Sequence, residues 1–242
     1  MTKKIAFLFP GQGSQYVGMG EDLYLNYAKA RELYDRAAEI LGQKLIDLSF
    51  RGPQEELQLT PNAQPAIMAH SIICWEILKQ QGFQPSLVAG HSLGEYTALV
   101  AAQSIPFDQA LMLVRKRGEF MQEAVPSGLG TMAAILGLDR EVVEGLCQQV
   151  SQDMVVEPAN YNAPGQVVIS GSRQAVELAV QLAKEKGAAK ASMLSVSGPF
   201  HCSLMKPAGR KLKTELDKLE FSDLLIPLIN NADAEILTSG NS

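Results

Sequence analysis

The segment Val88-Ala-Gly-His-Ser-Leu-Gly-Glu95 contains the pattern Gly-x-Ser-x-Gly, in which two glycines flank Ser92. Residues 85–90 read as a short buried strand and residues 95–103 as a helix. The serine therefore falls on a tight strand–turn–helix junction, which exposes the hydroxyl and directs it toward a helix N-terminus that favours developing negative charge. This arrangement predicts a nucleophilic serine in an α/β fold. The alternative is a tight turn in which Ser92 only caps the helix.

The composition is that of an ordinary globular chain whose 242 residues allow one large domain with a smaller insertion. No apolar run approaches the roughly 20 residues that span a bilayer. Met1-Thr-Lys-Lys leads directly into a strand-like segment, so we expect no signal peptide. The three scattered cysteines argue against disulfides and zinc sites and favour a reducing cytoplasm. The net charge of −5 argues against nucleic acid as a partner.

Ile5–Phe9 is a five-residue apolar run that predicts a buried parallel strand. It ends in Pro10-Gly-Gln-Gly-Ser-Gln15, where two glycines around Gln12 allow the backbone to come close to another group and to point N–H groups outward. The loop is therefore a candidate half of an oxyanion site. A simple turn between strand and helix is the alternative.

In the rest of the first half, helical spacing occurs at Glu21–Leu41, short helical turns are expected at Asp47–Phe50 and Pro53–Leu57, and a long helix is expected at Asn62–Gln81. The last of these helices is apolar on most sides, which is typical of a helix inside a large domain. We therefore interpret Trp75 and His70, which lie on it, as core residues.

Arg117 lies on a predicted helix, Phe107–Ala124, where it shares a mostly apolar stripe with Leu113 and Met121. An arginine on such a stripe is costly to bury unless it is paired. It therefore contacts a protein carboxylate, binds an anionic ligand, or extends to solvent.

The pattern changes after Pro126 and predicts βαββαβ, at Thr131–Leu136, Arg140–Val150, Val155–Asn160, Gln166–Ser170, Arg173–Lys186 and Ala191–Val196. This order is typical of a ferredoxin-like domain. A helix from Ser203 to about Leu219 and a strand at Leu224–Ile229 then resume the first pattern. The expected fold is an α/β-hydrolase-like large domain with a parallel sheet, residues 1–126 and 199–242, carrying a ferredoxin-like small domain, residues 127–198.

A serine hydroxyl needs a base, and the chain has three histidines. The side chain of His91 should point away from its neighbour Ser92, and His70 is placed inside an apolar helix. His201 follows the small domain on a loop that can overhang the serine, so elimination favours it as the base. No acid between Ser92 and His201 stands where a third triad member is expected, which favours a dyad.

Six motifs occur together and in order: Phe9-Pro-Gly-Gln-Gly-Ser-Gln15, Gly90-His-Ser-Leu-Gly-Glu95, Arg117 with Met121, Asn160-Tyr-Asn162, Gly165-Gln-Val-Val-Ile-Ser-Gly171 and Pro199-Phe-His201. Together they resemble the malonyl-CoA:acyl carrier protein transacylase family of bacterial type II fatty-acid synthesis. The resemblance covers essentially the whole chain.

The resemblance implies transfer of malonyl from malonyl-CoA to the phosphopantetheine thiol of acyl carrier protein through a malonyl-serine intermediate. Ser92 is the implied nucleophile and His201 the implied base. The backbone N–H groups of Gln12 and Leu93 are the implied oxyanion hole.

The resemblance also implies a binding site for the acyl group. Arg117 grips the malonyl carboxylate through a bidentate pair. Phe200 narrows the pocket beside the α-carbon, and Met121 and Asn162 line the same pocket.

No metal or organic cofactor is implied, since CoA is substrate and product, and a cytoplasmic monomer is expected. Carrier proteins are acidic, so we expect a local basic patch. Its candidates, for which a merely solvated face is the alternative, are Lys184, Lys186, Lys190, Lys206 and Arg210.

Family members usually continue past Thr238-Ser-Gly-Asn-Ser242 with further helices and a glutamine whose carbonyl orients the catalytic histidine. The resemblance therefore implies a C-terminally truncated large domain and leaves the orienting partner of His201 open. Three alternatives remain: a trans-acting malonyltransferase of a polyketide synthase, a serine thioesterase or esterase, and a catalytically silent fragment that binds a carrier protein. Acylation of Ser92 separates the last from the enzymes, and Arg117 with the insert argues against a simple esterase.

Overall fold

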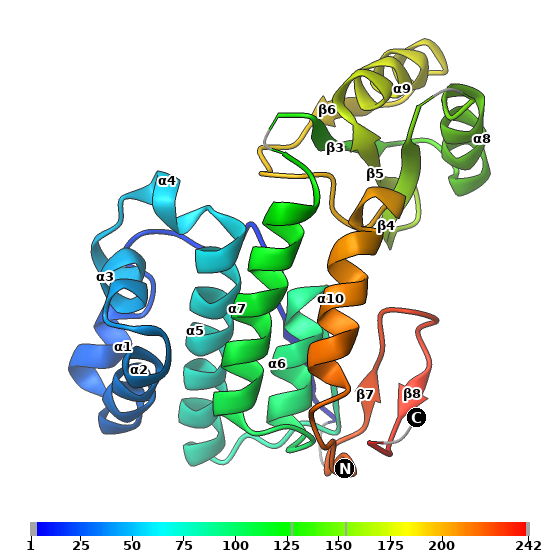
Figure 1. The fold of residues 1–242 in the computed structure, drawn as a ribbon. Helices are drawn as coiled ribbons and strands as arrows, with labels where there is room; N and C mark the ends of the chain where they lie inside the picture. Colours follow the sequence, from blue (N-terminus) through cyan, green and yellow to red (C-terminus); the bar gives the residue numbers. More distant parts are fainter. Residues whose placement is uncertain (1–3, 127, 153, 241–242) are drawn as a thin grey trace. The chain divides into compact units, whose positions relative to one another are not determined.

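The computed structural model describes residues 4–126, 128–152 and 154–240 (Figure 1). The chain divides into two compact units, one formed by Met1–Gly118 and Thr214–Ser242 and the other by Glu119–Lys213. These limits fall inside α7 (Phe107–Ala124) and α10 (Lys206–Leu216). The domain limits expected from sequence, 126/127 and 198/199, stay a prediction, and Ser127 lies outside the described residues.

The first unit contains a four-stranded sheet of order β1-β2-β7-β8, made of β1 (Ala6–Phe9), β2 (Leu87–Gly90), β7 (Leu228–Ile229) and β8 (Ile236–Leu237). The first three strands run parallel and β8 is antiparallel. This parallel sheet, connected through helices, confirms the predicted α/β class. Phe9 pairs with Gly90 at the carboxyl ends of their strands, so the loops that follow β1 and β2 begin side by side.

Helices α5 (Thr60–Gln80) and α6 (Leu93–Ala101) pack against each other, and α6 also packs on β1 and β2. Trp75 on α5 is 4% exposed, and its ring meets that of Phe7 edge-on at 5.3 Å between centroids. Val88 and Leu228 complete the same buried cluster. The interpretation of Trp75 as a core residue is confirmed.

Helix α5 contains a proline, Pro65, within its first turns. A proline has no N–H group, so the carbonyl of Pro61, four residues earlier, loses its intrahelical donor. Arg115 on α7 donates to this carbonyl through Nη1 at 2.9 Å and to Oδ1 of Asn62 at 2.8 Å. The guanidinium thus replaces the missing helical hydrogen bond and joins α7 to the start of α5.

The prediction of one continuous helix at Glu21–Leu41 is wrong in one respect, because the segment forms two helices. Tyr27 is extended (φ −123°, ψ 123°) and separates α1 (Glu21–Asn26) from α2 (Ala28–Leu41). The break places Tyr24 of α1 next to Tyr34 of α2 and to Phe50, at 6.1 and 5.5 Å between ring centroids. Figure 1 shows these helices beside α5, with α3 (Lys44–Arg51) and α4 (Gln54–Leu57) completing the group.

The strand expected at Leu224–Ile229 is reduced to β7, its last two residues. Pro227 supplies no N–H donor, and the preceding residues bond elsewhere. Leu224 donates its N–H to Thr238 O at 3.2 Å, and Leu225 donates to Ala102 O at 2.9 Å. The apolar run is therefore only partly strand.

The second unit contains an antiparallel sheet of order β4-β5-β3-β6, made of β3 (Gly130–Leu136), β4 (Val156–Ala163), β5 (Gln166–Ser172) and β6 (Lys190–Met193). Helices α8 (Arg140–Val150) and α9 (Arg173–Glu185) pack against each other and against these strands (Figure 1). This order is the split βαβ arrangement and confirms the predicted ferredoxin-like topology. The short helix η1 (Ser203–Met205) precedes α10.

None of the helices in the described part of the chain is long and apolar enough to cross a membrane.

His70 on α5 lies between two polar side chains. Its Nδ1 is 3.2 Å from the hydroxyl of Tyr34, and its Nε2 is 3.6 Å from Sγ of Cys74. Burial lowers the pKa of His70, against the opposing effect of Asp22. A neutral imidazole offers one donor and one acceptor, which matches these two partners. The geometry agrees with the structural interpretation of His70.

The lowered pKa of His70 predicts a pH-dependent stability. The unfolded chain protonates this residue below about pH 6.5, whereas the folded protein resists protonation, so the free energy of unfolding falls as the pH drops below that value. We expect His70→Gln to flatten this slope in urea titrations between about pH 5 and pH 7. Wild type and variant should show parallel behaviour above that range. Equal slopes for wild type and variant between about pH 5 and pH 7 would contradict the expectation.

A second prediction concerns glycines without room for a side chain. A Cβ on Gly90 would lie 1.9 Å from the carbonyl carbon of Gly94, whereas a Cβ on Gly145, inside α8, meets nothing within 4 Å. Gly90→Ala should lower the free energy of unfolding by about 3 kcal/mol, because backbone must move. Gly145→Ala should raise it by about 0.5–1 kcal/mol through helix propensity. Chemical denaturation of both variants tests the pair, and the same sign for both would refute the steric argument.

Candidate active site

Ser92 sits between the end of β2 and the start of α6 with φ 53° and ψ −102°. A positive φ in a non-glycine residue costs on the order of 1–3 kcal/mol and persists only where the surroundings enforce it. A Cβ on Gly94 would lie 2.2 Å from the Phe9 carbonyl oxygen, so α6 touches the end of β1 directly. The predicted strained strand–turn–helix around Ser92 is present in the structure.

The loop that contains Gln12 packs on this turn. A Cβ on Gly11 would lie 2.6 Å from the carbonyl oxygen of His91 and 2.8 Å from its Nδ1. The side chain of Gln12 donates from Nε2 to Oγ1 of Thr60 at 3.2 Å. The loop is therefore held both at the turn and at the start of α5. The oxyanion role of the Gln12 and Leu93 N–H groups stays a prediction.

Arg117 extends from α7 to Ser92. Its side chain donates from Nη2 to Oγ of Ser92 at 3.0 Å and from Nη1 to Oε1 of Gln64 at 2.8 Å. Its guanidinium carbon lies 5.4 Å from the centre of the Tyr96 ring. The residue is 9% exposed, which rules out extension to solvent. The partners named here are all uncharged.

The positive charge of Arg117 affects the pKa values of two residues near Ser92, Glu95 and Tyr96. Burial raises the pKa of Glu95, while the N–H of Asn231 and the charge of Arg117 act in the opposite direction. Burial also raises the pKa of Tyr96, again opposed by Arg117. The carboxyl and phenol groups are thus both partly withdrawn from water and lie within reach of the charge of Arg117.

Sequence reasoning missed two residues of this site, Gln64 and Asn231. Gln64 is 1% exposed on a helix that is apolar on most sides, and an amide on such a helix was a usable signal because buried polar groups need partners. Asn231 contacts the turn from 139 residues away in sequence, at 2.6 Å from its Oδ1 to the N–H of Ser92. No local sequence pattern predicts the contact between Asn231 and Ser92.

The other predicted site residues belong to the second unit. His201 has φ 59°, and Ser203 donates its N–H to Oε2 of Glu157 at 2.8 Å, which ties this segment to β4. Phe200 and Met121 are buried in one cluster, and Asn162 is exposed on β4. The roles of these residues toward a substrate stay predictions.

Backbone strain marks both predicted catalytic positions. Positive φ values occur at four non-glycine residues of the described chain, namely Ser92, Gln103, His201 and Ala234. Strain of this kind clusters at functional sites because a defined geometry is needed there. Two of the four, Ser92 and His201, are predicted catalytic residues, and their roles stay predictions.

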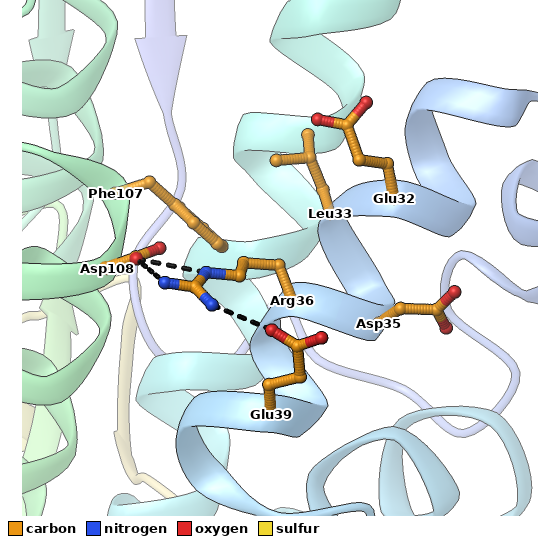
Figure 2. Close-up of a pocket in the computed structure, with 7 residues that line it drawn as sticks. All are labelled: Glu32, Leu33, Asp35, Arg36, Glu39, Phe107 and Asp108. Atoms are coloured by element: carbon orange, nitrogen blue, oxygen red, sulfur yellow. Dashed lines mark hydrogen bonds and ion pairs between the residues drawn. The ribbon is translucent and has the colours of Figure 1, made fainter.

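A pocket of about 520 Å³ on the first unit lies between α2 and the start of α7 (Figure 2). Figure 2 shows its one guanidinium, that of Arg36, directed at the carboxylates of Asp108 and Glu39. These ion pairs raise the pKa of Arg36. The cation is already neutralised, and none of the predicted site residues lines this pocket.

A strained serine on a strand–turn–helix of a parallel sheet is the arrangement in which acyl-transfer enzymes of the α/β class present a nucleophilic hydroxyl. In this protein a buried guanidinium donates to that hydroxyl. Within the described residues, no three His, Cys, Asp or Glu side chains are placed to hold a metal ion.

Comparison with known proteins gives the family. The chain belongs to the acyl transferase domain family, whose model matches residues 6–233. It is 54% identical over 236 residues to the malonyl CoA-acyl carrier protein transacylase of Bacillus subtilis (strain 168), covering 97% of this chain and 74% of that protein. The protein of the same name from Escherichia coli (strain K12) is 47% identical over 240 residues, covering 99% and 78%.

Solved structures agree with the fold. An acyl carrier protein S-malonyltransferase from Vibrio cholerae superposes with a TM-score of 0.94 at 49% identity. A malonyl-transacylase in complex with its type II PKS acyl-carrier protein superposes with a TM-score of 0.95 at 46% identity. Each match covers 99% of this chain and 78% of the other.

The contact between Gln64 and Arg117 leads to a stability prediction. Gln64→Leu removes the acceptor of a buried guanidinium N–H, which should lower the free energy of unfolding by about 1–3 kcal/mol. Removing the cation as well, in Gln64→Leu/Arg117→Met, should cost less than the sum of the single substitutions, because the unsatisfied donor is then absent. Urea unfolding of the four proteins measures the coupling. Additive costs would show that the two side chains do not depend on each other.

Proposed function

We propose that this protein transfers the malonyl group from malonyl-CoA to the phosphopantetheine thiol of an acyl carrier protein, as an [acyl-carrier-protein] S-malonyltransferase that supplies fatty-acid chain elongation. The observation that carries the proposal is the buried guanidinium of Arg117, which donates to Ser92 Oγ at 3.0 Å. A cation next to the nucleophile fits an acyl group that ends in a carboxylate. The names of the relatives described above point to the same substrate.

In the proposed first half-reaction, Ser92 Oγ attacks the thioester carbonyl carbon of malonyl-CoA and His201 accepts the hydroxyl proton. The N–H groups of Leu93 and Gln12 stabilise the oxyanion. The C–S bond then breaks, and CoA leaves with the proton returned by His201. The product is malonyl-Ser92.

In the second half-reaction, the phosphopantetheine thiol of the carrier protein gives its proton to His201 and its sulfur attacks the ester carbonyl. Cleavage of the ester bond returns the proton to Ser92 and leaves a malonyl thioester on the carrier. Water must stay out of the site between the two steps, because hydrolysis would waste the intermediate. The segments proposed to dock the carrier protein carry Lys184, Lys186, Lys190, Lys206 and Arg210.

Selectivity follows from the partners of Arg117. Malonyl places a carboxylate against the guanidinium in a bidentate pair. Acetyl offers no counter-charge, and a buried charge that lacks its partner costs about 3–5 kcal/mol. Met121, Asn162 and Phe200 are proposed to line the remainder of the acyl pocket, with Phe200 beside the α-carbon.

We further propose that the protein works in the cytoplasm, as a monomer, without a metal or organic cofactor. A specific comparison favours a second pathway, since one similar structure is a malonyl-transacylase bound to a type II PKS acyl-carrier protein. Competition between fatty-acid and polyketide carrier proteins for malonyl-Ser92 distinguishes the two pathways. Preferential transfer to the polyketide carrier would assign the enzyme to that pathway.

The first test is the intact mass of the protein after brief exposure to malonyl-CoA or acetyl-CoA. We expect a malonyl adduct that is absent in Ser92→Ala and forms roughly 100- to 4000-fold more slowly in Arg117→Ala, since about 3–5 kcal/mol of pairing is lost. Acetyl-CoA should label poorly. Lys116→Ala is the matched control, because Lys116 is an exposed cation on the same helix that pairs with Glu215.

The fate of the adduct separates the remaining functions. Transfer of the mass increment to a carrier protein establishes a transferase, whereas its loss to water at the same rate with and without carrier would indicate a thioesterase or esterase. A folded protein that forms no adduct would overturn the proposal and favour a silent carrier-binding role.

A further inference from the structure

Strand β7 is the neighbour of β2 in the sheet, and it ends before it reaches the level of Ser92. β2 and β7 pair in parallel, with Val88 opposite Leu228 and Ala89 opposite Ile229, where the ladder ends. The N–H of Val88 donates to Pro227 O at 2.9 Å. Parallel ladders repeat every two residues. Two steps further on, the N–H of Ser92 would donate to the carbonyl of residue 231, and the N–H of residue 231 would donate to Gly90 O.

The side chain of Asn231 makes both of these bonds in place of its backbone. Its Oδ1 accepts the N–H of Ser92 at 2.6 Å, and its Nδ2 donates to Gly90 O at 2.6 Å. A side-chain amide carries the same donor and acceptor as a peptide group. Asn231 therefore extends the ladder across His91 to Ser92, although β7 has already ended.

The backbone of Asn231 is thereby free to bind a second element. Its N–H donates to Oε2 of Glu95, in the first turn of α6, at 3.0 Å. One residue thus joins the end of β2, the nucleophile and the helix that follows it. Asn230 shapes the same loop but not the turn, since its Oδ1 accepts the N–H groups of Ala232 and Asp233 at 3.1 Å each.

We propose that Asn231 is the positioning residue of the nucleophile, and that its side-chain amide holds Ser92 in its strained conformation by replacing a strand. The N–H of Ser92 is used in this contact. This inference rests on the proposed role of Ser92 as the nucleophile.

The test compares Asn231→Ala, Asn231→Asp and Asn230→Ala by the rate at which Ser92 reacts. Two reagents are used, malonyl-CoA and a neutral fluorophosphonate that reacts with activated serines, with intact mass as readout. Loss of the amide should slow both reactions about 100-fold, the effect of a small misplacement of a reacting group. The malonyl-CoA concentration at half-maximal rate should stay unchanged, because Arg117 is untouched.

The Asn231→Asp variant distinguishes the effect of the two hydrogen bonds from the effect of side-chain volume. It keeps the volume and the acceptor for Ser92 N–H but places an oxygen against Gly90 O, so we expect it to be slowed as well. Asn230→Ala should react like wild type. An Asn231→Asp protein as fast as wild type, or an Asn230→Ala protein as slow as Asn231→Ala, would overturn the proposal in favour of packing or general loop geometry.

Amide hydrogen exchange in the unsubstituted protein gives a reading that does not depend on any variant folding. We expect the N–H of Ser92 to be protected like that of Val88, and exchange at the rate of an open loop would refute the inference. A different outcome would contradict the proposed function alone. If malonyl-CoA leaves no adduct on wild type while the fluorophosphonate rates follow the expected order, the malonyl proposal falls and the role of Asn231 stands.

Discussion

Helix α6 approaches the ends of β1 and β2 so closely that neither Gly90 nor Gly94 has room for a Cβ. The pairing of Phe9 with Gly90 brings the two strand ends to one level, and the helix begins three residues after the second of them. A chain that reverses from strand to helix in so little space must pass through an unfavourable dihedral region at its apex. The strain at Ser92 is thus a consequence of backbone contact between three elements.

Charge is the second organising feature of this site. The guanidinium of Arg117 is buried and shares its donors between Gln64 and the hydroxyl of Ser92. Gln64 orients the cation without neutralising it, whereas a carboxylate in its place would cancel the charge. The arrangement holds a positively charged group at the hydroxyl of Ser92, with α7 supplying the cation and α5 the amide that orients it.

The motif around Ser92 was sufficient to predict the strand, the turn and the helix, because glycine spacing and apolar runs are local properties. The βαββαβ order of the second unit was equally accessible from its periodicity. The interruption at Tyr27 could not be predicted from the sequence, since no helix-breaking residue stands there. The extended backbone is accompanied by packing of Tyr24 on Tyr34. The site residues Gln64 and Asn231 were not predicted for a related reason. Their partners lie on other elements, and only the folded chain brings donor and acceptor together.

The contact between Asn231 and Ser92 also depends on the order in which the chain is synthesised. The two residues are 139 positions apart, with the whole ferredoxin-like unit encoded between them. At a synthesis rate of about 5–20 residues per second, the chain grows for roughly 7–28 s after Ser92 has been added before Asn231 follows. The nascent protein therefore contains its serine long before it contains the amide that locks it. Vectorial synthesis therefore places completion of the turn after synthesis of the whole ferredoxin-like unit.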